Sequence, residues 1–304
     1  MNGMVRKSCQ SAVLVIMAAG HNIAGAAGAE TEWFADTEAT AIYDDNVSRA
    51  ERERDIVYDK MLLANIGLAY NRELSSERAI TLRSFLQIEQ FFEVEGLSHS
   101  SVGGQFIYRW QNELGFSAPF YQFNTTVQFN EFRVQQRDNT EINSQFIVSK
   151  RITDSILAST GLEYNYQDSS GVVFDQSRSR WFLNADYATR SGWALYGTYS
   201  FIHGDTTSTA QAVFCNGAAA PDTFGLVIAS EAIEVDQAFS DEFCGKWVSY
   251  RLNANTNMLV LGLNKGIGNS MALDFSVRKV LVNGAGDNDY DRTIFNASLL
   301  VRFR

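Results

Sequence analysis

Apolar and polar residues alternate along nearly the whole chain after residue 30. Successive side chains of a β-strand point to opposite faces, so this period of two predicts strands with one apolar and one polar face. Segment 295–303 is the most regular example. Its polar face holds Asn296, Ser298 and Arg302, with Leu300 as the exception. Its apolar face holds Phe295, Ala297, Leu299, Val301 and Phe303.

About twelve segments show this alternation, whereas helical periodicity is scarce. The phase blurs near Asn255–Asn257, which predicts a β-bulge there. The predicted strands cover residues 33–43, 62–70, 80–92, 106–114, 121–129, 142–152, 156–166, 181–187, 193–201, 247–263, 271–277 and 295–303.

The connections alternate in length, which separates two ends of the predicted sheet. They are short near residues 75, 117, 154, 191 and 268, and mostly longer and more polar at 44–57, 95–103, 134–140, 167–178, 204–246 and 282–289. A soluble sandwich gives no reason for this segregation. Short turns at one end, long loops at the other and an even strand count are typical of a membrane β-barrel. The chain is therefore predicted to be all-β, an antiparallel up-and-down transmembrane β-barrel of about 12 strands.

Closure of that barrel has a physical reason. In lipid every backbone N–H and C=O must find a partner within the protein, and an open sheet edge leaves a row of them unpaired. The apolar face then meets lipid and the polar face meets the lumen. Aromatic residues near the predicted strand ends, among them Trp33, Trp193 and Trp247, suit the girdles at the membrane surfaces. The alternative for these aromatics is the core of a sandwich.

The first 29 residues have the layout of a secretory signal peptide. Arg6 and Lys7 precede an apolar run at 11–20, and Ala27-Gly28-Ala29 offers a cleavage site. The run is too short to span roughly 30 Å of hydrocarbon as a helix. Residues 30–304 are then one barrel domain. Removing two basic residues changes the formal charge from −10 to −12, and basic patches are absent, which argues against nucleic-acid binding.

The last strand also carries an assembly pattern, in which a polar residue is followed by spaced apolar and aromatic positions. The matching residues are Asn296, Ser298, Val301 and Phe303, although Ser298 stands where glycine is usual and Arg304 follows the aromatic. In this the chain resembles the bacterial outer-membrane β-barrel superfamily, and YDDNVSRA and YRWQNELGFSAP are similar to uncharacterised proteobacterial members. The resemblance implies the outer membrane of a Gram-negative bacterium, contact with lipid and lipopolysaccharide, and recognition by the barrel-assembly machinery.

Charged residues of both signs lie on the polar faces, which are expected to point inward. A narrow, porin-like channel for polar solutes could use these charges for selectivity. A filled interior braced by arginine–carboxylate pairs is the alternative, because twelve strands lie between filled and open barrels. The candidate lumen residues are Arg83, Glu89, Arg109, Glu113, Arg151, Glu163, Asp186, Arg251, Asp274, Arg278 and Arg292.

The connection 204–246 is the longest and holds two cysteines, Cys215 and Cys244. An even pair in an oxidising compartment predicts a disulfide. The apolar run Phe224–Ala229 could fold over the mouth and gate it, bind a partner, or form a cap that stabilises the rim. The second hypothesis for function is therefore a non-conducting barrel, structural or partner-binding, that acts through this disulfide-closed loop.

An enzyme and a metal site are the remaining classes. His203 and Asp205 near Ser208 form the only cluster resembling a hydrolase triad, but triads depend on geometry, and a polar rim histidine explains His203 better. Asp44-Asp45-Asn46 and Asp287-Asn288-Asp289 could offer oxygen ligands, although residues of these types are ordinary in turns. We therefore expect no catalytic residues, no cofactor and no metal.

Overall fold

A computed structural model describes residues 31–113, 115–212, 214–215, 218–219, 221–286 and 288–303. The predicted signal peptide, Leu114, Asp287 and Arg304 lie outside the described residues. Twelve long strands dominate: β1 (Thr31–Asp44), β2 (Asp59–Ser75), β3 (Arg78–Phe91), β4 (His99–Gln111), β5 (Phe120–Phe132), β6 (Asn139–Arg151), β7 (Ile156–Ser169), β8 (Gln176–Ala188), β9 (Trp193–Gln211), β13 (Trp247–Ile267), β14 (Met271–Gly284) and β15 (Asn288–Phe303).

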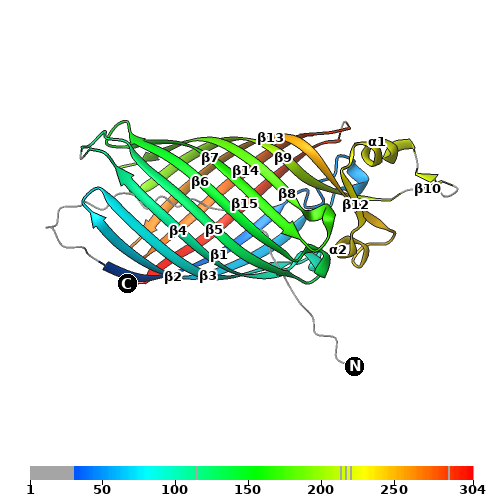
Figure 1. Cartoon of the computed structure of the whole chain (residues 1–304), viewed down its shortest axis with the longest axis horizontal. Helices are drawn as coiled ribbons and strands as arrows, with labels where there is room; N and C mark the ends of the chain where they lie inside the picture. The colour runs from blue at the N-terminus through cyan, green and yellow to red at the C-terminus, as the bar shows by residue number, and fades with distance from the viewer. Residues whose placement is uncertain are drawn as a thin grey trace, which may run out of the picture.

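These twelve strands close into a barrel (Figure 1). Neighbours along the chain pair antiparallel, β9 pairs with β13, and β15 pairs back to β1, from Ala35 opposite Phe303 to Asp44 opposite Ile294. No barrel strand is left with an open edge within this ring. The predicted twelve-stranded up-and-down barrel is confirmed.

The remaining elements lie in the long connections, at what we call the loop end. The opposite end, with the short connections, is the turn end (Figure 1). The small elements are η1 (Glu53–Asp55), η2 (Glu95–Leu97), η3 (Gln135–Arg137), η4 (Val172–Phe174), β10 (Phe214–Cys215), β11 (Ala218–Ala219), α1 (Pro221–Ala229), β12 (Ala232–Val235) and α2 (Gln237–Ser240). None of the helices in the described ranges is both long enough and apolar enough to cross a membrane.

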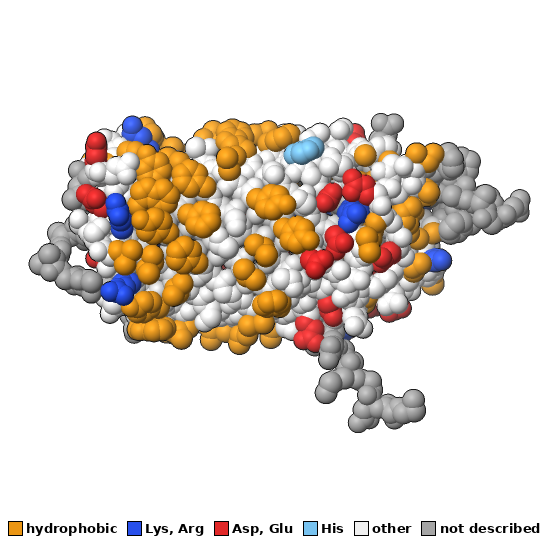
Figure 2. All heavy atoms as spheres, viewed as in Figure 1, with side chains coloured by type: hydrophobic (Ala, Val, Ile, Leu, Met, Phe, Trp, Pro, Cys, Tyr) orange, Lys and Arg blue, Asp and Glu red, His pale blue; other side chains and the backbone are white. Residues whose placement is uncertain are grey.

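The outer wall is apolar, as the alternation predicts. Large apolar side chains such as Leu62, Leu86 and Leu261 are about half exposed, and Figure 2 shows such side chains over the middle of the wall with charged ones toward both ends. At the turn end, the ring of Trp33 lies tilted against that of Tyr70 (ring centroids 4.9 Å apart), and aromatic residues of β4 and β5 form a further group. The wall thus has the apolar band and an aromatic girdle of a membrane barrel.

Two expectations about β13 were wrong. Pairing with β9 runs without a register shift from Trp247 to Lys265, so there is no bulge at Asn255–Asn257. The phase blurs because these asparagines face outward and bond outward side chains of β9: Asn255 Oδ1 lies 2.9 Å from His203 Nδ1, and Asn257 Oδ1 accepts from the Tyr199 hydroxyl at 2.6 Å. Trp247 is no girdle residue; it is 5% exposed and packs inside the loop end.

Candidate functional site

The lumen is built from the polar faces of the twelve strands. On β3, for example, Arg83, Gln87 and Glu89 alternate with the outward residues Leu82, Leu86 and Ile88. Several of these inward side chains keep part of their surface accessible inside the closed wall: Arg83 is 20% exposed and Asp36 is 25% exposed. Solvent-sized space therefore remains inside the barrel next to charged groups.

An ion-paired cluster lies in the turn half of the lumen. Arg83 Nε donates to Asp36 Oδ2 at 3.0 Å, and Arg83 Nη2 donates to Asn65 Oδ1 at 2.6 Å. Nearby, Asp274 is nearly buried and accepts a hydrogen bond of 2.8 Å from the Tyr196 hydroxyl. Such buried or half-buried charges are stable because each has partners.

Large inward side chains lie along the wall, over glycines of neighbouring strands. A Cβ added to Gly103 would overlap the ring of Phe85, one at Gly161 would overlap Phe182, and one at Gly262 would overlap Tyr196. The glycines thus let bulky rings lie close to the backbone. This arrangement leaves the centre of the lumen less obstructed than rings that point across it.

The same arrangement places arginines over aromatic rings. The Arg83 guanidinium carbon is 5.2 Å from the centre of the Phe85 ring, and that of Arg180 is 5.0 Å from the centre of Phe182. Cation–π contact favours this stacking. Arg180 also pairs with Glu163 at 3.1 Å, so two strands present an Arg-x-Phe triplet to the lumen, each with a carboxylate beside the arginine.

The loop half of the lumen is richer in arginine. Arg292 pairs with Asp44, and Arg178 Nη2 donates to Asn165 Oδ1 at 3.1 Å. Arg278 is also inward and mostly enclosed, and its Nε has no hydrogen-bond partner among the described residues. Arg178 and Arg180 were not among the predicted lumen residues, although the alternation of β8 places both on its inward face.

A hydrophobic cap closes over the inside of the loop end. Its buried members come from strand ends, loops and α2: Met61, Phe91, Val94, Leu97, Val134, Ala238, Phe239 and Trp247. Phe239 is 1% exposed, with ring centroids 5.6 Å from Trp247 and 6.3 Å from Phe243. The segment that enters the mouth is therefore α2. The apolar run Phe224–Ala229, for which a gate, a partner site and a rim cap were the alternatives, forms α1, buries Leu226 against β9 and β13, and leaves Ile228 69% exposed.

One buried carboxylate anchors this cap. Asp236, which is fully buried, accepts from Arg137 Nη2 at 2.5 Å and from the Ser249 hydroxyl at 2.7 Å. Its other oxygen accepts from the backbone N–H of Ala238 at 3.1 Å and so caps α2. The loop is thereby tied both to η3 and to β13.

Three of the predicted lumen residues do not border the open part of the lumen. Glu113 is exposed in the connection after β4, because that strand ends at Gln111. Arg251 lies at the loop end, where its Nη1 donates to the Val172 carbonyl at 2.9 Å. Glu89 faces inward but is 5% exposed beneath the cap, with Oε2 3.1 Å from His99 Nε2.

The other predicted lumen residues do face inward. Arg109 and Arg151 are exposed at the turn-end opening, where Arg151 lies over the ring of Phe116. Asp186 is half-buried and accepts from Asn184 at 2.8 Å. Their part in selectivity stays a prediction.

The predicted disulfide is not formed in the structure. Cys244 is a free, exposed cysteine, and the side chain of Cys215 lies outside the described residues. What orders this part of the loop is the aromatic cluster around Phe239, together with a hydrogen bond of 2.8 Å from Gln211 Nε2 to the Cys244 carbonyl.

The possible triad at His203 is not assembled. His203 bonds Asn255 on the outer wall, as described above, whereas Asp205 Oδ2 accepts from the Ser177 backbone at 2.8 Å. Asp44 and Asn46 are used in folding the β1–β2 loop. Across the described ranges, no group of three or more His, Cys, Asp or Glu side chains is placed to hold a metal ion.

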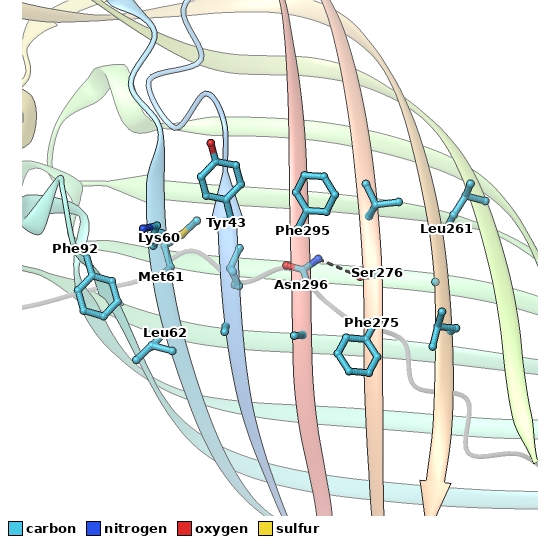
Figure 3. Close-up of a pocket in the computed structure, with 16 residues that line it drawn as sticks. Tyr43, Lys60, Met61, Leu62, Phe92, Leu261, Phe275, Ser276, Phe295 and Asn296 are labelled. Atoms are coloured by element: carbon cyan, nitrogen blue, oxygen red, sulfur yellow. Dashed lines mark hydrogen bonds between the residues drawn. The ribbon is translucent and has the colours of Figure 1, made fainter.

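A shallow apolar groove crosses the outside of β2, β1, β15, β14 and β13 (Figure 3). Tyr43, Phe295, Phe275 and Leu261 rise beside small residues such as Ala297. The groove lies on the lipid-facing wall, and its lining is almost wholly apolar. It is part of the membrane surface and holds no cluster of reactive groups.

No protein-family model matches the chain, and no curated protein matches it. Among solved structures, it is similar to the COG4313 outer membrane channel from Pseudomonas putida F1, with a TM-score of 0.57, 10% identity, and coverage of 92% of this chain and 97% of that one. Weaker similarities include the NanC porin (TM-score 0.44, 9% identity, 87% and 98% covered) and the KdgM porin (0.39, 8%, 88% and 99%).

The fold and the wall chemistry agree with one another. A closed barrel that carries an apolar band outside and charged groups inside satisfies the backbone within lipid while keeping a polar interior. The chain therefore has the fold of the bacterial outer-membrane β-barrels, and its surface fits a location in the outer membrane of a Gram-negative bacterium.

Proposed function

We propose that this barrel is a narrow, passive channel for small polar solutes and that charges in the lumen set its selectivity. The observation that carries the proposal is the set of partly exposed ion pairs inside the closed wall, such as Arg83–Asp36 and Arg180–Glu163. A filled interior braced by the same pairs would leave them no accessible surface. The rings that lie flat over Gly103, Gly161 and Gly262 support the same function.

The similarity to a Pseudomonas outer membrane channel over most of both chains is further support. An enzyme is less well supported, because the one candidate triad is not assembled. In this channel the cap over the loop end would act as a gate, and solutes would pass when the segment around Phe239 moves aside.

Planar-bilayer recording of the purified protein tests the channel. We expect discrete current steps, and Arg83→Ala should shift the reversal potential in a KCl gradient toward cation selectivity, because Asp36 then loses its neutralising partner. Arg190→Ala removes the same charge from an exposed turn and should leave the reversal potential unchanged. If protein that is verified to be a folded barrel shows no discrete current steps, the channel is ruled out.

A non-conducting barrel that acts through loop 204–246 is the second candidate. The observation in its favour is the cap, since α2 and its aromatic neighbours fill the mouth with buried apolar groups. The exposed Ile228 on α1 offers that loop a surface for a partner. The contacts around Phe239 order this loop without a disulfide between Cys215 and Cys244. The bilayer recording separates the two candidates, because this second one predicts no current steps.

The proposed partners are outer-membrane lipid, lipopolysaccharide and the barrel-assembly machinery. Support for the barrel-assembly machinery as a partner comes from β15. In this strand Phe303 is 54% exposed on the outer wall, and the side-chain amide of Asn296 donates to the Ser276 hydroxyl at 3.1 Å. The assembly pattern of Asn296, Val301 and Phe303 thus coincides with the strand that closes the barrel against β1.

A further inference from the structure

Five arginines gather inside the loop half of the lumen, and we call them the arginine cluster. Arg178 and Arg180 come from β8, Arg278 from β14 and Arg292 from β15, while Arg49 comes from the β1–β2 loop. Arg278 interacts electrostatically with Arg292 and Arg180, and Arg49 with Arg292 and Arg178. Distant parts of the chain thus bring like charges together.

The carboxylates near this cluster are fewer than the arginines. Asp44 pairs with Arg292, Glu163 pairs with Arg180, and Glu141 interacts with Arg178. Asp45 also interacts with Arg292. Four acids thus face five guanidinium groups, which leaves an excess of positive charge. Like charges gathered in an enclosed space repel one another unless an anion joins them.

Arg278 is the member whose need for a partner is clearest. Its Nε is enclosed and has no hydrogen-bond partner among the described residues, and Asp44, a carboxylate that interacts with it electrostatically, is already paired with Arg292. Its neighbour across the β14–β15 pair is Arg292, since Arg278 lies opposite Ile294 and Arg292 opposite Val280. An enclosed guanidinium without an acceptor is costly, so its position suits a ligand that is itself an acceptor.

The backbone conformation of Arg49 also supports a binding site here. Its φ of 58° lies in the left-handed region, which a residue with a Cβ rarely adopts. Asn46 holds this loop by bonding both the N–H and the carbonyl of Ala50, and Ser48 bonds the Asp55 carbonyl. Burial, followed by the charge of Arg292, lowers the pKa of Arg49 to about 10. A strained loop that places one more cation beside others is typical of a binding site.

The turn half of the lumen has a different charge pattern. There Glu38 interacts with Asp36 and Asp274, and Arg83 is a cation that interacts with Glu38 and pairs with Asp36. The excess of positive charge is therefore a property of the loop half, bounded above by the hydrophobic cap and beside it by the ring of Phe182.

We propose that the arginine cluster binds a small multivalent oxyanion, with carboxylate or phosphate groups, inside the lumen beneath the cap. Arg278 and Arg292 would grip one anionic group, because guanidinium groups bind such oxygens in bidentate fashion, and Arg178 would meet a second. The site would name one class of solute for the proposed channel. It rests on that function in one respect, which is that the anion must be able to enter the lumen.

Calorimetric titration of the full-length protein in detergent tests the site, with citrate and inorganic phosphate as separate probes at neutral pH and low salt. We expect binding of at least one probe, weakened about tenfold or more in Arg278→Gln and less in Arg278→Lys. Arg190→Gln, which removes an exposed turn arginine, should bind as the native protein does. Circular dichroism and heat-dependent gel mobility verify that each variant is a folded barrel.

The outcomes separate this inference from the proposed function. Citrate binding alone assigns a polycarboxylate, phosphate binding alone assigns a phosphate-bearing ligand, and either supports the site. Binding without ion conduction keeps the site and rejects the channel. If folded native protein binds neither probe, or if Arg278→Gln binds both as tightly as the native protein, the inference is overturned whatever the conductance.

Discussion

At the scale of single residues, the inward glycines determine how much of the lumen stays open. Gly262 lies under the ring of Tyr196, whose hydroxyl bonds Asp274, so one small position supports both a ring against the wall and a buried carboxylate. Glycine costs a strand some stability because it has no side chain to pack. At this position the loss is offset by the ring that covers it.

Gly262→Val tests this packing. The new side chain would overlap Tyr196 and push its ring toward the lumen axis, so we expect a smaller single-channel conductance and a loss of about 1–3 kcal/mol in unfolding free energy. The control is Gly266→Ala on the same strand, because nothing lies within 4 Å of a Cβ added there. Equal conductance in the two variants would show that Tyr196 does not border the conducting path.

Residue roles were predictable where alternation alone decides them. Arg83, Asp274 and Arg278 face inward as expected, because each lies within a regular strand with lipid on its other face. Glu113 was misplaced because the strand stops at Gln111, and strand ends are poorly marked in sequence. The stacking of Arg83 over Phe85 depends on Gly103 of the next strand, which alternation within one strand does not reveal.

At the scale of elements, the cap is the feature that the sequence indicated least well. Phe224–Ala229, considered as a gate, a partner site or a rim cap, forms α1 on the rim, whereas the segment that enters the mouth is α2. Burial of Phe239 depends on its meeting Phe243, Trp247 and residues of four other connections or strands. Such tertiary contacts leave no periodic pattern in a long loop.

Phe239→Ala tests whether this cap is a gate. Removing a fully buried ring costs about 3–5 kcal/mol, and here the loss falls on the closed position of the loop, because the barrel strands keep their own pairing. We expect a higher open probability in bilayers and faster proteolysis within loop 204–246. Ile228→Ala, on exposed α1, should change neither. If Phe239→Ala conducts as the native protein does, the cap is not a gate, and α2 has only a structural role.

At the scale of the whole molecule, one pattern determines the architecture. Alternation with long and short connections predicted the strand number, the closure and the side facing lipid, since a backbone in lipid has few other ways to satisfy its polar groups. The distribution of charge inside the lumen could be predicted from the sequence only in part. The charge excess of the arginine cluster arises from β8, β14, β15 and a loop, which are far apart in sequence, and only the closed ring brings them together.

The placement of the wall in lipid gives the last prediction. Leu261 lies in the half of β13 that ends at the turn end, within the apolar wall. It points outward, as Figure 3 shows, and is 51% exposed. An arginine at the membrane midplane of a β-barrel costs about 2–4 kcal/mol, so Leu261→Arg should lower the unfolding free energy by that amount when measured by urea unfolding in lipid vesicles. Val172→Arg changes an exposed residue of η4, at the loop end, and should have little effect, because its side chain meets water. Equal stability of the two variants would mean that the outer wall of β13 is not in hydrocarbon, and the membrane-spanning orientation would then be wrong.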